Sequence, residues 1–377
     1  MKKNFIKNAG LLVALCALCA VSCQKETVLD SITTATGSSS GQTTLTISLS
    51  NIGLSGFTKV SGDQTSAESR ISNVQVFIFR PDGKLDASKY WNTTSASLEP
   101  IQCSIGERSC WVVVNAPEDY TGTVSVLSDL TSKKVVLADN TDSKGTKLIM
   151  VGNEMKDSSG KTVTKLTAGT MNVKVEVSRL VSAVSLVSFV NAMQTVAFQN
   201  NFYYRGAYLM NVPGIQSIDG TVKASSTTKQ NWYAWYAKAS SGPVSLLTET
   251  PGSALKVEFG KNYTASVPTF YSFPSDIGGD IDNASTKNNR VEGDGKDVLS
   301  STYLIVEATV GSGANAVDCV YPVLLPQLKP NKKYNVSLTV NHIGGDPEKP
   351  WEKIEFSDLK PVIEIADWDE KSIEELI

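Results

Sequence analysis

The sequence contains very few side chains whose type and spacing could support catalysis. His342 is the only histidine among 377 residues, and it stands in a glycine-rich segment directly after the alternating run 333–341. One histidine cannot supply a site built from several imidazole ligands, and the residues around it offer no partners for a Ser–His triad. Acidic pairs that could hydrolyse glycosides occur in any chain of this size, and no particular pair stands out. We therefore predict that the protein is not an enzyme and that His342 is a surface turn residue.

Three aspartates in the long polar segment 276–298 are a second chemical candidate. Asp276, Asp280 and Asp282 carry the oxygen ligands that Ca²⁺ prefers, but their spacing does not match that of an EF-hand loop. A solvated loop is the interpretation that we favour, and Ca²⁺ binding is the alternative. No cofactor is expected elsewhere in the chain.

An aromatic cluster at 231–236 could bind a carbohydrate. Exposed Trp and Tyr rings stack on sugar rings, so the cluster could contact a glycan. Packing at the edge of a strand explains the same residues and is the interpretation that we favour. The residues concerned are Trp232, Tyr233, Trp235 and Tyr236.

The first 23 residues indicate export. Lys2 and Lys3 precede the apolar run 11–21, which is too short to span a bilayer as a stable helix. Small residues follow, and the sequence from Ala20 to Cys23 resembles the lipobox of bacterial lipoproteins, although Leu is more common than Ala at its first position. An ordinary signal peptide is the alternative. Two or more acyl chains on Cys23 would hold the exported protein stably on a membrane.

Three of the six cysteines are left once the signal segment and the acylated Cys23 are set aside. Cys103 and Cys110 flank a short polar loop, and an exported protein can form disulfides, so these two could pair; two separate thiols are the alternative. Cys319 lies in the apolar run 317–323, which predicts a buried thiol.

Composition favours a folded, exported protein of about two domains. The net charge is −3, with 41% hydrophobic and 19% charged residues, which argues against nucleic-acid binding and against a disordered chain. The segment 23–42 is rich in Ser, Thr and Gly and is predicted to be a polar tether. The predicted domains are residues 43–192 and 193–377, after a signal peptide at 1–22.

The segment 43–79 contains two predicted strands joined by a long polar connection. Leu45, Ile47 and Leu49 alternate with polar residues, as in a strand that buries one face. A connection of about twenty polar residues follows and leads to a second, more apolar strand at 71–79. We call Leu45, Ile47 and Leu49 the plug residues, because this first strand looks suited to removal from its sheet.

The remaining chain reads as short strands separated by turn clusters, which predicts an all-β fold built from β-sandwiches. A short helix or a turn is expected near 127–130. The strand candidates are 109–115, 146–152, 171–186, 202–212, 269–273, 303–310, 333–341 and 362–368.

Several of these segments together resemble the fimbrillin family, the pilins of Bacteroidetes type V pili. Each segment alone is only weakly specific for this family, but the order of the segments along residues 43–368 is more specific. The matching segments are 71–79 with Gly83, Gly106 before 111–116, 149–152, 177–181, 207–212, 269–274, 331–336 and 362–368.

The resemblance implies two transthyretin-like β-sandwich domains in tandem. It also implies export as a lipoprotein, followed by proteolytic trimming on the outer membrane. In that family a trypsin-like protease removes the first strand together with the lipid, and a strand from another subunit fills the groove. Lys59–Val60 matches the family's cut, with Lys where Arg is frequent, and Arg70–Ile71 is the alternative. The donor strand would come from residues 353–377.

Two further functions stay open on the sequence alone. A surface glycan-binding lipoprotein would use the aromatic cluster at 231–236, and an uncut pilus anchor would keep both its lipid and its first strand. Removal of the first strand distinguishes a polymerising subunit from both. The expected partners are therefore other pilus subunits and, before processing, the outer membrane.

Overall fold

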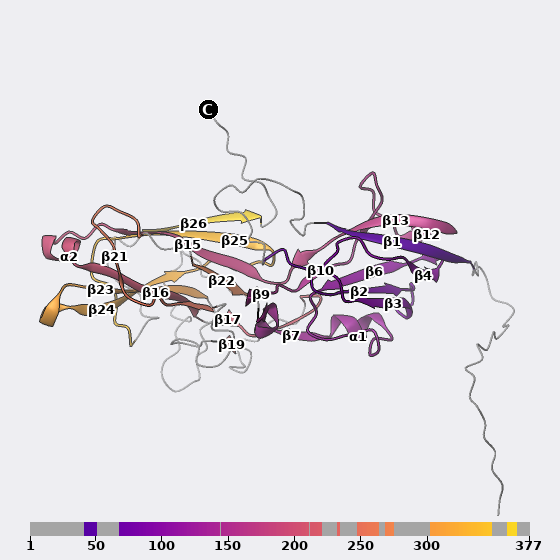
Figure 1. The fold of residues 1–377 in the computed structure, drawn as a ribbon, viewed down its shortest axis with the longest axis horizontal. Coiled ribbons are helices and arrows are strands. Elements are labelled where there is room, and N and C mark those ends of the chain that lie inside the picture. The colour runs from indigo at the N-terminus through magenta and orange to yellow at the C-terminus, as the bar shows by residue number, and fades with distance from the viewer. Residues whose placement is uncertain are drawn as a thin grey trace, which may run out of the picture. The chain divides into compact units, whose positions relative to one another are not determined.

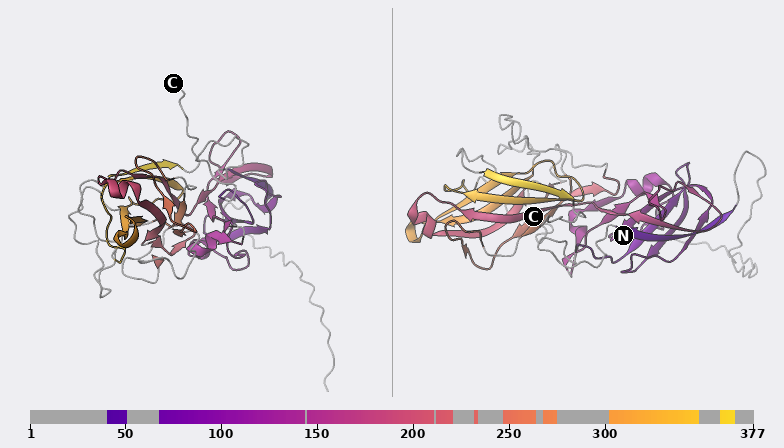
Figure 2. Two further views of the ribbon diagram at one scale, coloured as in Figure 1. Left: turned by 60° about the vertical axis from the view of Figure 1, so that its left-hand side comes forward. Right: turned by 90° about the horizontal axis from the view of Figure 1, so that it is seen from above.

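The computed structural model is built mainly from β-strands, as the sequence predicts (Figures 1 and 2). It has two short α-helices in its described part, α1 (Leu127–Thr131) and α2 (Val196–Asn200), and the 3₁₀ turns η1 (Leu137–Asn140) and η4 (Gly313–Asn315). The residues that the structure describes are 41–50, 68–143, 145–210, 212–220, 232–233, 247–263, 268–274, 302–348 and 360–367.

Two sheets are formed by strands that precede residue 180. Sheet A has the order β11 (Met155–Lys156), β13 (Gly169–Glu176), β1 (Gln42–Ser50), β4 (Ile101–Ser104). Sheet B has the order β14 (Ser178–Arg179), β10 (Met150–Gly152), β6 (Ser109–Val114), β2 (Val74–Phe79), β3 (Leu85–Trp91). The two sheets share one apolar cluster, to which alternate residues of β1, β2, β6 and β13 contribute.

Two further sheets are formed by strands that follow residue 181. Sheet C has the order β22 (Thr269–Ser272), β15 (Ser182–Asn191), β25 (Lys332–Val340), β26 (Lys360–Asp367). Sheet D has the order β20 (Thr248–Glu249), β16 (Phe202–Met210), β23 (Tyr303–Val310), β24 (Val317–Leu324), and β21 (Leu255–Lys256) also pairs with β16.

Short two-stranded ribbons complete the described part of the chain. One of them joins a segment of the second half to a segment of the first. The ribbons are β12 (Lys165–Leu166) with β5 (Gly106–Glu107), β17 (Val212–Pro213) with β19 (Trp232–Tyr233), β18 (Ile215–Ser217) with β7 (Lys134–Val136), and β8 (Thr141–Asp142) with β9 (Gly145–Thr146).

The strand patterns follow from which faces are covered. β1 alternates because only one of its faces is apolar and buried. Every residue of β2 is buried, since sheet B is covered on both faces: Val76 and Ile78 belong to the cluster shared with sheet A, whereas Phe77 and Phe79 belong to the large cluster that continues into sheets C and D. An uninterrupted apolar run is what such a strand requires.

Sheet membership changes between Arg179 and Ser182. β14 still pairs with β10 of sheet B, but β15 already pairs with β22 and β25 of sheet C. The sequence prediction divides the chain at residue 193, after the run 179–186 that looks like a continuation of the previous strand. Local alternation does not reveal this change, because consecutive strands of two different sheets can share one apolar run.

The two halves repeat one strand arrangement. β1 lies between a parallel neighbour, β13, and an antiparallel neighbour, β4. β15 likewise lies between parallel β25 and antiparallel β22. The sequence shows no fixed repeat period, so this correspondence becomes visible only in the pairing.

Asp86 on β3 ties the edge of sheet B to sheet A. Its side chain is 1% exposed and accepts hydrogen bonds from the backbone and hydroxyl of Ser104 on β4, at 2.8 and 2.7 Å. The Nε atoms of Arg80 and Arg108 each lie 3.1 Å from its carboxylate. Burial alone would raise the pKa of Asp86, but these hydrogen bonds outweigh burial and lower it to about 2.

We expect Asp86→Asn to lower the free energy of unfolding by about 2 kcal/mol at neutral pH, because one pKa unit corresponds to about 1.4 kcal/mol. The folded-state pKa lies below the unfolded value, so this contribution is present above pH 4 or so and is lost as the pH falls toward 2. Urea unfolding at several pH values measures it. Glu99→Gln, at a side chain that is 77% exposed, is the control. A variant as stable as the control at pH 7 would contradict the assignment.

Candidate functional site

The first strand occupies the centre of sheet A and is paired along both edges. Thr43 to Ser50 pair in parallel with Gly169 to Glu176 of β13. Gln42 to Leu45 pair antiparallel with β4, and the backbone pairing then continues to the loop before β4, where Leu98 donates to Ile47 at 3.0 Å and Leu49 donates to Ala96 at 2.8 Å. Figure 1 shows β1, in indigo, alongside β13, although 126 residues separate Thr43 from its partner Gly169.

The plug residues fill the apolar space under sheet A. Leu45, Ile47 and Leu49 are 0%, 1% and 8% exposed, so the alternation in the sequence corresponds to a buried row of side chains. They belong to one cluster with residues of β4, β13 and the facing sheet B. The other members from these strands include Ile101, Cys103, Val173, Val175, Val74, Val76, Ile78, Val112 and Val114.

Polar side chains fix the register of β1 at its other face and its ends. The Thr43 hydroxyl donates to the carbonyl of Gly169 at 2.8 Å, and the Gln102 amide donates to the Thr44 hydroxyl at 2.8 Å. The Ser48 hydroxyl donates to Val173 at 3.4 Å. A slip by one residue would turn the plug residues to this polar face, so the register is strongly specified.

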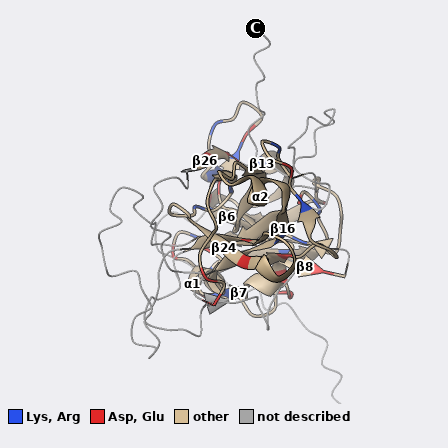
Figure 3. Cartoon of the chain, turned by 90° about the vertical axis from the view of Figure 1, so that its left-hand side faces the viewer, with Lys and Arg blue, Asp and Glu red and all other residues tan. Residues whose placement is uncertain are grey.

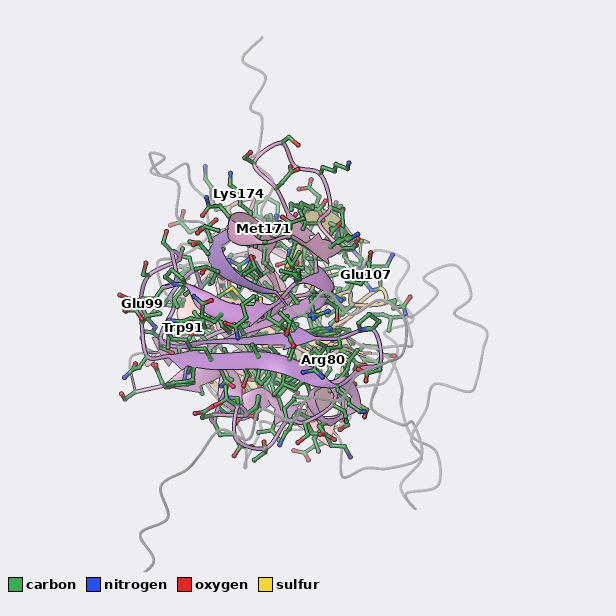
Figure 4. The ribbon with its side chains drawn as sticks, turned by 90° about the vertical axis from the view of Figure 1, so that its right-hand side faces the viewer. Arg80, Trp91, Glu99, Glu107, Met171 and Lys174 are labelled. Atoms are coloured by element: carbon green, nitrogen blue, oxygen red, sulfur yellow. The ribbon has the colours of Figure 1, made fainter. Side chains whose placement is uncertain are left out.

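The site that these contacts define is a groove for one extended strand. Its two walls, β4 and β13, offer backbone hydrogen-bonding groups, and its floor is apolar. An incoming segment would need apolar residues at every second position and polar residues between them. Figure 4 labels Met171 and Lys174 of β13, which pair with Leu45 and Ser48 of β1.

Several predicted site residues lie outside the residues that the structure describes. These are Cys23, Lys59, Val60, Trp235, Tyr236, Asp276, Asp280 and Asp282. The backbone of Trp232 and Tyr233 forms β19, which pairs with β17. Lipidation, processing, glycan contact and Ca²⁺ binding at these positions stay predictions.

The alternative cut at Arg70–Ile71 falls on described residues. The Arg70 guanidinium donates to the Asp142 carboxylate at 3.0 Å, and Ile71 is 3% exposed. Sequence reasoning found both residues but missed Asn115, which is fully buried and contacts the same segment. The signal for it was weak, because a single Asn after a run of valines has no periodic pattern.

The three cysteines in the described part of the chain are buried, and His342 contacts its neighbour Asn341. Cys103 and Cys110 are buried free thiols on opposite sheets, and Cys319 is buried as predicted. Burial raises the pKa of Cys103 to about 11, with Asp86 adding to the effect, so this thiol is protonated at neutral pH. The Nδ1 atom of His342 lies 2.8 Å from the Asn341 amide oxygen.

Within the described ranges, no three His, Cys, Asp or Glu side chains gather closely enough to hold a metal ion. No helix in this part of the chain has the length and apolar character needed to cross a membrane. Figure 3, which faces the end of sheets C and D, shows Lys and Arg in blue and Asp and Glu in red on the described strands and loops.

Comparison with known proteins identifies the fold. The structure matches a fimbrillin from Porphyromonas gingivalis W83 with a TM-score of 0.54 and 17% identity, over 86% of this chain and 97% of that one. The chain has the fimbrillin fold.

Two further structures share this fimbrillin fold. A "putative cell adhesion protein" from Bacteroides eggerthii is 21% identical, with a TM-score of 0.56 over 87% of this chain and 97% of that one. Another protein of the same description, from Parabacteroides distasonis, is 15% identical, with a TM-score of 0.53 over 87% and 99%. None of the three is described as an enzyme. No family model and no curated protein matches the sequence.

Substitution of a plug residue tests whether the buried row of side chains holds β1 in the groove. We expect Ile47→Ala to lower the free energy of unfolding by about 3 kcal/mol, because it removes buried methyl groups and leaves a cavity. Thr46→Ala, on the polar face of the same strand, should change it by only about 0.5 kcal/mol. Denaturant unfolding of the uncut chain measures both. Equal effects of the two substitutions would show that the buried row does not hold β1 in place.

Proposed function

We propose that the protein is a structural subunit of a cell-surface pilus that serves adhesion. It would be exported as a lipoprotein acylated at Cys23 and would lose its first strand by proteolysis after Lys59. The groove thus opened would accept a strand of another subunit. The observation that carries this proposal is the position of β1, a strand at the centre of a sheet whose pairing partners are both distant in sequence.

The connection after β1 supports removal by a single cut. Between Ser50 and Val74 the sequence offers a trypsin-like protease two sites, Lys59 and Arg70. Cleavage there would separate β1 covalently from every strand that follows. The strand would then be held only by its hydrogen bonds and by the burial of its plug residues.

Loss of β1 would leave an unsatisfied groove. Two rows of backbone groups, on β4 and on β13, would lose their partners, and the apolar row beneath them would face water. Three side chains of this type contribute about 2 kcal/mol each when fully buried. A donor strand would restore both the backbone hydrogen bonds and the apolar burial. The free energy gained in this way would drive assembly.

The donor is proposed to come from residues 353–377. β26 lies in this range, at the edge of sheet C, and is paired only with β25 on the sheet's described path. Val362 and Ile365 on this strand are 56% and 57% exposed. An edge strand leaves its sheet at the loss of one row of hydrogen bonds, whereas a central strand loses two. The C-terminal strand is therefore the easier one to donate.

We also propose that sheets A and B form one transthyretin-like sandwich domain and sheets C and D a second. The repeated arrangement around β1 and β15 supports this division, with the boundary between Arg179 and Ser182. The location that follows from this function is the outer membrane surface and then the pilus. The protein would act through subunit contacts, without catalysis or a cofactor.

Lys59→Gln tests the proposed function. Cells that produce this variant should retain the chain as an unprocessed lipoprotein and should lack surface filaments of it in electron micrographs. Lys329→Gln, which lies outside the connection after β1, is the control and should leave the filaments intact. Filaments of normal length built from uncut Lys59→Gln subunits would contradict strand removal and favour the uncut anchor. Specific retention of the uncut chain on a glycan array would favour the glycan-binding lipoprotein.

A further inference from the structure

The segment that follows the proposed cut is held by contacts of Glu68, Arg70, Ile71 and Ser72, on both sides of the Arg70–Ile71 bond. Trypsin-like enzymes bind several residues of an extended substrate, insert the Arg or Lys side chain into a pocket, and add water across the peptide bond. Susceptible bonds therefore lie in exposed segments whose backbone and side chains are free to leave. The described residues 68–73 have the opposite properties.

Asn115 holds the backbone around the bond. Its Nδ2 donates to the carbonyl of Arg70 at 2.7 Å, and this carbonyl belongs to the peptide bond that would be cut. Its Oδ1 accepts from the backbone N–H of Ser72 at 2.8 Å, and its Nδ2 also donates to Leu148 at 2.8 Å. Asn115 is fully buried and has a left-handed backbone with φ of 60°, a conformation that Asn tolerates better than most residues.

The side chains on both sides of the bond are engaged as well. The Arg70 guanidinium donates to Asp142 at 3.0 Å and to the carbonyl of Thr146. Ile71 is 3% exposed and belongs to the cluster between sheets A and B. Neither side chain can enter a protease subsite without first breaking these contacts.

Glu68 fixes the start of the segment to the second half of the chain. It is 2% exposed, and its carboxylate accepts a hydrogen bond from the hydroxyl of Tyr271 on β22 at 2.7 Å. The Nζ of Lys333 on β25 lies 3.8 Å from its other oxygen. Burial and the neighbouring Glu68 charge raise the pKa of Tyr271, so the hydroxyl keeps its proton for this bond at neutral pH.

Arg179 connects Glu68 to Asn331, which directly precedes β25. Its side chain is fully buried, and its Nε donates to the carbonyl of Glu68 at 3.3 Å. Its Nη1 donates to the Asn331 amide oxygen at 3.2 Å. A buried guanidinium is stable only with such partners, so release of Glu68 would leave a buried charge less well satisfied.

We infer that residues 68–73 form a clamp that closes the Arg70–Ile71 bond to trypsin-like proteases and confines processing to residues before Glu68. The clamp also keeps the new amino-terminal segment attached after β1 departs, so the groove opens without further loss of structure. Its biological use rests on the proposed function, but its protective effect belongs to the folded chain and can be measured separately.

The test is native trypsin digestion of the purified chain carrying Lys59→Gln, followed by N-terminal sequencing of the fragments. This background removes Lys59, the other trypsin site in the connection between Ser50 and Val74. We expect the Arg70–Ile71 bond to stay intact. Adding Glu68→Ala or Tyr271→Phe should accelerate the appearance of a fragment that begins at Ile71 by on the order of tenfold, because each removes a buried hydrogen bond and cleavage follows the population of the opened state.

Glu107→Ala, at an exposed glutamate labelled in Figure 4, is the matched control and should leave the rate unchanged. Global unfolding would give simultaneous cuts at many Lys and Arg residues. If Glu68→Ala unfolds the chain in this way, the cleavage rate of the more conservative variant Tyr271→Phe tests the clamp. Rapid cleavage after Arg70 in the Lys59→Gln chain, or a Tyr271→Phe rate equal to the control, would overturn the clamp. An uncut chain on the cell surface would overturn the proposed processing and leave these results standing.

Discussion

The burial of Leu45, Ile47 and Leu49 is the interaction on which sheet A depends. β1 separates β4 from β13 in this sheet, so the walls of the groove meet only through the strand between them. The same three side chains complete the apolar cluster shared with sheet B. A strand that supplies both the pairing and the packing of a sheet can be exchanged only for another strand with the same alternation. This constraint links the fold to the proposed assembly.

The contrast between β1 and β15 bears on the proposal that β1 is removed while β15, its equivalent in sheet C, stays in place. Both lie between a parallel and an antiparallel neighbour, and both bury apolar side chains. β15 is continuous with β14 through residues 180–181, within the described and largely buried part of the chain. β1 is followed instead by a long polar connection that contains Lys59. The difference is therefore in the connection, while the pairing is alike.

Local pattern predicted many of the strands and gave no prediction of their partners. The alternation around Ile47 and the apolar run of β2 predict a half-buried and a fully buried strand, and both are observed. β3 went unrecognised because it has no clear alternation, and most of its residues are partly buried. The parallel pairing of β1 with β13 joins segments more than a hundred residues apart, and a period of two carries no information about that choice.

The candidate site was predictable only in its apolar part. The plug residues are visible as a pattern, whereas Asn115 and Arg179 act through hydrogen bonds to segments distant in sequence. Their importance comes from burial, which makes each unsatisfied polar group costly, and burial of isolated polar residues is not encoded in local sequence. The mass and N-terminal sequence of the protein taken from assembled surface filaments would show whether β1 is removed. We expect chains that begin at Val60 and lack residues 42–50. Filaments whose subunits begin at an acylated Cys23 and still contain β1 would contradict this expectation.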